Sequence, residues 1–175
     1  MSTDFKTIVE NKETKHEEKT IQLVEWIHAN ETEINNIITY GFTTKPLTRA
    51  VCIEAIGIVV KEKQHLANTP LLAFVTKGLT DKQSRVKIES SKVIAIIAKQ
   101  FPYQLEEAIG HLLKNAKNIE NDIRTSAAYT LSQIIRLNTS FNQQIIPKVE
   151  KLLATEERNG IKKIYSDAIK KVSNL

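Results

Sequence analysis

Apolar residues recur along most of this chain with the period of an amphipathic helix, and the pattern itself repeats. Four stretches align when each is counted from one basic residue, at intervals of 38, 37 and 38 positions. The four basic residues are Arg49, Lys87, Arg124 and Lys162. In each stretch, mostly apolar side chains at offsets of minus one, three, seven and ten fall along one stripe of a 3.6-period helix. The pattern therefore predicts four equivalent helices, each with a broad buried face.

Small side chains occupy the middle of most of these stripes. At offset three they are Cys52, Ser90 and Ala127, and at offset four they are Ser91, Ala128 and Ser166. Because a small residue leaves room beside its own helix, we expect neighbouring helices to approach closely at these positions.

A shorter apolar-periodic segment precedes each of the four helices. These segments cover residues 33–40, 70–79, 104–114 and 146–154, and the breaks after them are rich in Gly, Asn, Asp, Thr and Pro. Pro70 suits a first helical position after Thr69, and Pro147 suits the first turn of its segment. The repeated unit is therefore predicted to be a helix, a short loop and a second helix.

Two helices with one apolar stripe each cannot bury both stripes alone, so successive pairs must stack and share a core. The prediction is an all-α solenoid of about four helical pairs, forming one domain over residues 16–175. The pairs cover about residues 31–63, 69–101, 103–138 and 140–174.

At the level of these residues the unit resembles the HEAT repeat family, whose second helix typically reads Asp, Val-Arg, a small pair and Ala-Leu-Gly. The matching residues are Ile123-Arg124, Ala127-Ala128 and Leu131-Ser132, then Arg49 with Ala55-Ile56-Gly57, and Asp81 with Val86-Lys87. The resemblance covers about residues 31–175 and implies a right-handed, HEAT-like solenoid whose second helices line a concave face. The Asp of the family is replaced by Thr43, Asn118 and Glu156 in the other units, so a continuous ladder of Asp–Arg pairs is not implied.

The N-terminal segment differs from the repeats in charge. Residues 1–33 contain eight acidic residues and four lysines, a net charge of minus four. Because the whole chain carries plus five, the remaining residues carry plus nine. Residues 18–29 are predicted to form a helix that caps the open end of the stack, with Trp26 packed in it rather than binding a ligand. Residues 1–15 are polar, with three alternatives: they form a short helix around Phe5 and Ile8, stay mobile or, less favoured, fold as an acidic tail over a basic surface.

Composition narrows the class of protein. A chain of 175 residues that is 41% hydrophobic can bury a sizeable core. Its single cysteine, Cys52, falls on a predicted buried face and is expected to fill the core rather than act as a thiol nucleophile. With no apolar run long enough for a membrane span and a polar N terminus unlike a signal peptide, the sequence predicts a cytoplasmic, soluble protein.

Motifs that carry chemistry are missing. The sequence has no glycine-rich phosphate loop and no metalloprotease, CxxC or nucleophile-elbow pattern. The four histidines, His16, His28, His65 and His111, lie on different predicted elements, so no metal site is expected. We therefore predict neither catalytic residues nor cofactors.

The surface of the second helices is the remaining candidate site. The repeat places Arg49, Lys87, Arg124 and Lys162 in one column, Lys61, Lys99 and Arg136 in a second, and Lys92, Tyr129, Ile58 and Ile96 between them. Each column also has a structural explanation: the first could pair with carboxylates of neighbouring loops, and the second could complement helix dipoles. Taken as a surface, the two columns form an amphipathic groove suited to an acidic or amphipathic peptide.

Two functions of different classes follow. The first is a non-enzymatic scaffold that binds a protein partner along the concave face, with basic columns steering an acidic segment. The less favoured alternative is nucleic-acid binding through the same columns, because related helical-repeat proteins include alkylpurine DNA glycosylases. The last helix has two apolar sides, formed by Ile161, Ile164, Tyr165, Ile169 and Val172, which also predicts self-association through the C-terminal repeat.

Overall fold

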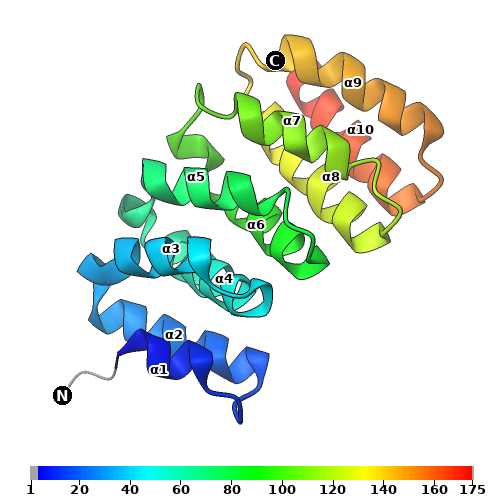
Figure 1. The fold of residues 1–175 in the computed structure, drawn as a ribbon. Helices are drawn as coiled ribbons and strands as arrows, with labels where there is room; N and C mark the ends of the chain where they lie inside the picture. The colour runs from blue at the N-terminus through cyan, green and yellow to red at the C-terminus, as the bar shows by residue number, and fades with distance from the viewer. Residues whose placement is uncertain (1–3, 175) are drawn as a thin grey trace. The chain divides into compact units, whose positions relative to one another are not determined.

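The computed structural model describes residues 4–174, shown as a ribbon in Figure 1. The predicted all-α class is confirmed, since these residues form ten α-helices and three short 3₁₀ helices, with no β-strand among them. The helices group into two compact units, one ending at Ile97 and one beginning at Ala98, and each is described by itself.

The helices of each unit follow one another with short connections. In the first unit they are α1 (Phe5–Glu10), α2 (His16–Ala29), α3 (Ile34–Thr43), α4 (Pro46–Glu62), α5 (Thr69–Gly78) and α6 (Ser84–Ile97). The 3₁₀ helices η1 (Glu31–Glu33) and η2 (Gln64–Leu66) precede α3 and α5. In the second unit they are η3 (Ala98–Gln100), α7 (Glu106–Asn115), α8 (Asn121–Arg136), α9 (Asn142–Thr155) and α10 (Asn159–Ser173).

In the first unit, α3 with α4 and α5 with α6 form helical hairpins. Local chemistry explains their starts: Pro46 occupies the first turn of α4, and the Asn68 side chain caps α5 by accepting a hydrogen bond from the Leu71 amide at 2.9 Å. The second helices α2, α4 and α6 pack side by side, and α3 packs on α5 (Figure 1). Because α4 lies between two helices of its own layer and against α3, only a narrow strip of it stays exposed.

The acidic N-terminal segment also contains a helical pair. Before α2 lies the short helix α1, one of the three alternatives for residues 1–15, and its Phe5 is buried. The Phe5 ring lies 5.5 Å from the rings of both Trp26 and Tyr40, measured between centroids. Trp26 thus packs against an aromatic neighbour of its own unit, as its predicted role in the cap requires.

In the second unit, α7 with α8 and α9 with α10 form the hairpins. The two second helices pack against each other, and the Ser132 hydroxyl on α8 donates a hydrogen bond to the Ile164 carbonyl on α10 at 3.2 Å. The first helices α7 and α9 also touch. Each unit therefore repeats one arrangement, in which first helices contact first helices and second helices contact second helices.

The first helices of the four hairpins start one or two residues from the predicted position, except α9, which starts four residues earlier. Helix α5 begins at Thr69 because Asn68 caps it. Helix α9 begins at Asn142 and contains Pro147 in its interior, so the prediction that Pro147 lies in the first turn is wrong. The earlier start is anchored in the core, where the Asn142 side-chain amide donates to the Ile135 carbonyl at 2.8 Å. Proline near the N-terminal end of α9 removes one backbone donor, a cost that the packed helix tolerates.

Five of the six small residues predicted to lie where helices approach closely are buried, and the sixth, Ser166, is half-buried. Cys52, Ser90, Ser91, Ala127 and Ala128 are each at most 1% exposed. Gly57 adds a position that the offsets did not include, because a Cβ there would lie 2.6 Å from Cγ2 of Val93. Only glycine lets α4 and α6 approach so closely at this point.

Burial also decides the chemistry of the one cysteine. Loss of solvation raises the pKa of the Cys52 thiol to about 12, so the thiol stays protonated at neutral pH. Among the described residues, no helix is both long enough and apolar enough to cross a membrane.

Candidate functional site

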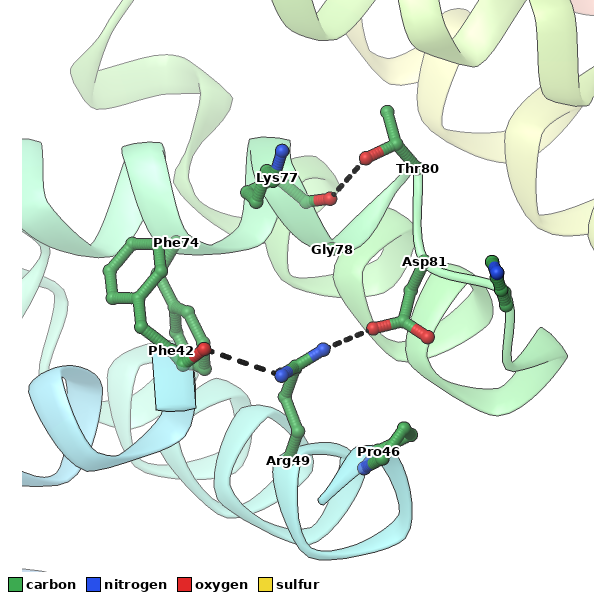
Figure 2. Close-up of a pocket in the computed structure, with 9 residues that line it drawn as sticks. Phe42, Pro46, Arg49, Phe74, Lys77, Gly78, Thr80 and Asp81 are labelled. Atoms are coloured by element: carbon green, nitrogen blue, oxygen red, sulfur yellow. Dashed lines mark hydrogen bonds and ion pairs between the residues drawn. The ribbon is translucent and has the colours of Figure 1, made fainter. Parts of the chain in front are cut away.

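The basic residue that marks the first repeat, Arg49, joins two consecutive hairpins. Its guanidinium donates to the carbonyls of Gly41 and Thr44 at 2.9 Å each, and to that of Phe42 at 3.3 Å. These carbonyls end the first helix of its own hairpin. A further nitrogen pairs with the Asp81 carboxylate, in the loop of the next hairpin, as Figure 2 shows. Asp81 in turn accepts the Gln83 amide at 2.8 Å, so its carboxylate is held from two sides.

Arg124 makes the same arrangement in the second unit. Its Nε lies 3.2 Å from Oε2 of Glu156 and its Nη1 lies 3.0 Å from the Asn118 carbonyl. Burial disfavours the charged form of Glu156, but hydrogen bonds from the Arg158 amide and from Arg124 outweigh it and hold the pKa below the usual range. In each unit the arginine and its acid are 32 residues apart, so both ion pairs occupy one register of the repeat.

This geometry supports the structural explanation for two members of the first column. The planar guanidinium offers five donors, and here they satisfy carbonyls at a helix C-terminus together with a carboxylate of the next hairpin. Lys87 and Lys162 stand in the same register but are half-buried without an ion pair among the described residues. At the position of the repeat where Asp81 and Glu156 stand, six residues before the basic residue, the third repeat has the uncharged Asn118. The ladder is therefore discontinuous, as the replaced Asp positions implied.

Beside the Arg49 pair lies a hollow of about 410 Å³ (Figure 2). Its apolar wall is formed by Phe42 and Phe74, whose ring centroids are 4.9 Å apart, together with Pro46. Lys77 and Lys82 line its rim without an ion pair among residues 4–174. The corresponding hollow of the second unit lies beside Arg124 and Glu156, so these shallow sites follow from the hairpin junction itself.

The outer face of the second helices in the first unit is mixed in charge. His16 Nε2 and Arg85 Nη2 approach the same oxygen of Glu54, at 2.7 and 3.2 Å, which links α2, α4 and α6. Burial opposes ionisation of Glu54, but the hydrogen bonds from His16 and Arg85 keep its pKa below the usual range. Lys92 lies 2.9 Å from Glu89 of its own helix.

The remaining predicted contact residues have the exposure that binding needs. Ile58 and Tyr129 are 41% and 49% exposed, and Ile96 is half-buried. Lys61, Lys99 and Arg136 are exposed and form no ion pair with any described residue. Lys61 and Arg136 occupy the last turns of α4 and α8, where the helix dipole also favours a positive charge.

One basic cluster lies on the first helices, outside the columns that the repeat of the second helices predicted. Lys117, Lys148 and Lys151 line a hollow of about 510 Å³ between α7 and α9, the first helices of the second unit. The sequence carried a signal for this cluster, since Lys148 and Lys151 each directly precede a buried apolar position of α9, Val149 and Leu152.

The histidines were also compared with the ligand sets that metal ions need. Within residues 4–174, His, Cys, Asp and Glu side chains form no group of three able to hold a metal ion. His16 and His28 instead contact Glu54 and Glu62 on the neighbouring helix. In comparisons with known proteins, no family model matches the chain, and no curated protein matches it in sequence.

Proposed function

We propose that this protein is a non-enzymatic interaction scaffold, built as a HEAT-like right-handed α-solenoid, that binds a protein segment along the concave face formed by its second helices. The observation that carries the architecture is the recurrence of one inter-hairpin ion pair, Arg49–Asp81 and Arg124–Glu156, at one register in both units. Such a repeated junction is what a stack of equivalent hairpins needs, because each hairpin contacts mainly its neighbours.

In each unit the proposed binding face combines exposed apolar side chains with basic residues that have no ion-pair partner within residues 4–174. Ile58 and Tyr129 supply contact area, while Lys61 and Arg136 supply charge from the ends of the same two helices. An exposed apolar side chain beside basic residues suits an acidic partner with a large apolar residue. Lys87, Lys92, Ile96, Lys99 and Lys162 extend this face, whereas Arg49 and Arg124 act in the scaffold itself.

Nucleic-acid binding is the weaker alternative. The net charge of plus nine after residue 33 favours it. Against it, Glu54 lies at the centre of the first unit's face, and Tyr129 is the one exposed aromatic among the residues assigned to the face. Single-stranded nucleic acid is usually bound by several stacking aromatics together with a basic track. The cytoplasmic location stays a prediction of the sequence.

Affinity purification with quantitative mass spectrometry tests the scaffold. The variant carries Ile58→Asp and Tyr129→Asp, and the control carries Tyr103→Asp and Ile119→Asp, which change residues at least as exposed elsewhere on the surface. We expect at least one protein to be captured by wild type and control but lost from the face variant. Equal capture by all three would reject this face as the binding site.

A salt-dependent binding measurement tests the nucleic-acid alternative. Fluorescence anisotropy with labelled single-stranded and duplex DNA or RNA would show affinity falling steeply between about 50 and 200 mM salt if the face binds phosphates. Binding of this kind, lost on reversing Lys61 and Arg136, would replace the scaffold by a nucleic-acid function.

A further inference from the structure

A second surface lies on the opposite type of helix, between α7 and α9. The hollow there is lined by Leu113 and Lys117 from α7 and its following turn, and by Lys148, Lys151, Leu152 and Thr155 from α9. Leu113 is half-buried and Leu152 is 9% exposed, so the two leucines form an apolar floor. The three lysines are exposed around this floor.

No carboxylate lines this hollow, and none of its lysines forms an ion pair with a residue of the described chain. The adjoining hollow contains Glu156 and Glu157, but Glu156 is already paired with Arg124. Lys148 and Lys151 are also three residues apart on one helix, where like charges repel. Three cations concentrated on an apolar floor therefore have no internal counter-charge that would explain them.

The helix that borders this hollow carries a glycine with no role in internal packing. A Cβ added to Gly110 would meet nothing within 4 Å, in contrast to the tight contacts at Gly57. Glycine weakens a helix interior relative to alanine, so its presence in the middle of α7 calls for another reason. Gly110 and Leu113 are three residues apart and share one stripe of α7, and Lys117 lies in the turn that follows the helix. The missing side chain thus opens the backbone of α7 to close approach on the side of the basic hollow.

We propose that the surface formed by Gly110, Leu113, Lys117, Lys148, Lys151 and Leu152 is a docking site for an acidic segment of a partner protein. One apolar side chain of that segment occupies the floor between Leu113 and Leu152. Its carboxylates pair with the three lysines, and its backbone passes over Gly110. The apolar floor and the absence of aromatic side chains from the lining favour a peptide over a nucleic acid, whose bases need stacking partners. This site does not depend on the face assigned to the second helices.

The test selects peptides rather than assuming one. A phage-displayed library of random peptides of about 12 residues, which as a helix would match the length of α7, is panned on the full protein. We expect enrichment of sequences with several Asp or Glu residues and at least one large apolar residue. Amide shifts in an NMR titration with an enriched peptide should map to α7 and α9.

Two variants and a control then locate the site by fluorescence anisotropy. Lys117→Glu, Lys148→Glu and Lys151→Glu together should weaken binding about tenfold or more, as expected for three charge pairs reversed. Lys12→Glu, Lys15→Glu and Lys45→Glu make the same change of charge on exposed residues of the first unit and should leave affinity within about twofold. Gly110→Ala should weaken binding several-fold while the melting temperature does not fall.

Several outcomes would overturn the proposal. These are failure to enrich any peptide, enrichment without acidic residues, or equal loss of affinity in the two triple variants. Unchanged peptide binding by the Gly110→Ala variant would show that the peptide backbone does not pass close to α7 at Gly110. Binding of an oligonucleotide that the Lys117, Lys148 and Lys151 reversal abolishes, in the absence of an enriched peptide, would assign the surface to nucleic acid.

Discussion

The inter-hairpin ion pair makes a quantitative prediction for Arg49→Ala. The substitution removes donors from the carbonyls of Gly41, Phe42 and Thr44 and leaves the Asp81 carboxylate, 8% exposed, without its charge partner. Removing one member of a buried pair typically costs 3–5 kcal/mol, and the 21% exposure of Arg49 lowers this to about 2–4 kcal/mol. Arg49→Lys keeps the charge but gives up the fork of donors, so we expect an intermediate loss of about 1–2 kcal/mol.

Lys87→Ala is the matched control, because Lys87 holds the same register of the repeat without an ion pair among the described residues. Its substitution should change the free energy of unfolding by no more than about 0.5 kcal/mol. Urea unfolding followed by far-UV circular dichroism measures all three variants. Thermal unfolding should show Arg49→Ala about 4–16 °C below wild type, at about 2–4 °C per kcal/mol for a chain of this size.

Two results would contradict the proposed stabilising role of Arg49. If Arg49→Ala and Lys87→Ala lower stability equally, or if Arg49→Ala costs less than about 0.5 kcal/mol, the arginine does not stabilise the junction. Arg49 would then return to the residues available for binding.

Three further predictions test other parts of the structure. Folding lowers the pKa of Glu156 below its usual range, so the stabilising contribution of this residue is present above a pH of about 4.3 and is lost as the pH falls further. The Glu156→Gln variant should therefore be less stable than wild type at pH 7. It should also lose less stability than wild type between about pH 5 and 3. A wild-type urea midpoint that falls no faster than that of the variant would contradict this. The Cys52 thiol, fully buried with a pKa of about 12, should react with a thiol reagent only as fast as the protein unfolds, and rapid labelling of the native protein would refute its burial. Gly57→Ala should destabilise by about 1–3 kcal/mol because the added Cβ meets the stiff Val93 side chain, whereas Gly110→Ala should stabilise by about 0.5–1 kcal/mol; equal effects would show that the two glycines share one role.

Periodicity was a reliable guide to the helices and a poorer guide to their ends. The apolar stripe around Arg124 predicted α8, whose Ile123, Leu131 and Ile134 are buried. The start of α9 was misplaced because Pro147 looked like a first-turn residue, while the contact that anchors this end, Asn142 to the Ile135 carbonyl, crosses from one hairpin to the next. A sequence window of one helix does not contain such a contact.

The candidate site, too, was predicted only in part from the sequence. Sequence placed Arg49 and Arg124 in one column, and left open whether they bind a partner or a neighbouring loop. Their acids stand 32 residues later, so only the folded chain decides between these roles. It also brings Leu113 of α7 beside Lys148 of α9, a juxtaposition that no single segment predicts.

By itself, the sequence determined that the chain is helical, where most helices lie and which stripe of each is buried, because these properties follow from side-chain spacing within one turn or two. Only the tertiary structure decided which basic residues form ion pairs and which do not, because a basic side chain pairs with a carboxylate that lies close to it in space. For Arg49 that neighbour is Asp81, while for Lys117, Lys148 and Lys151 the described chain supplies no carboxylate.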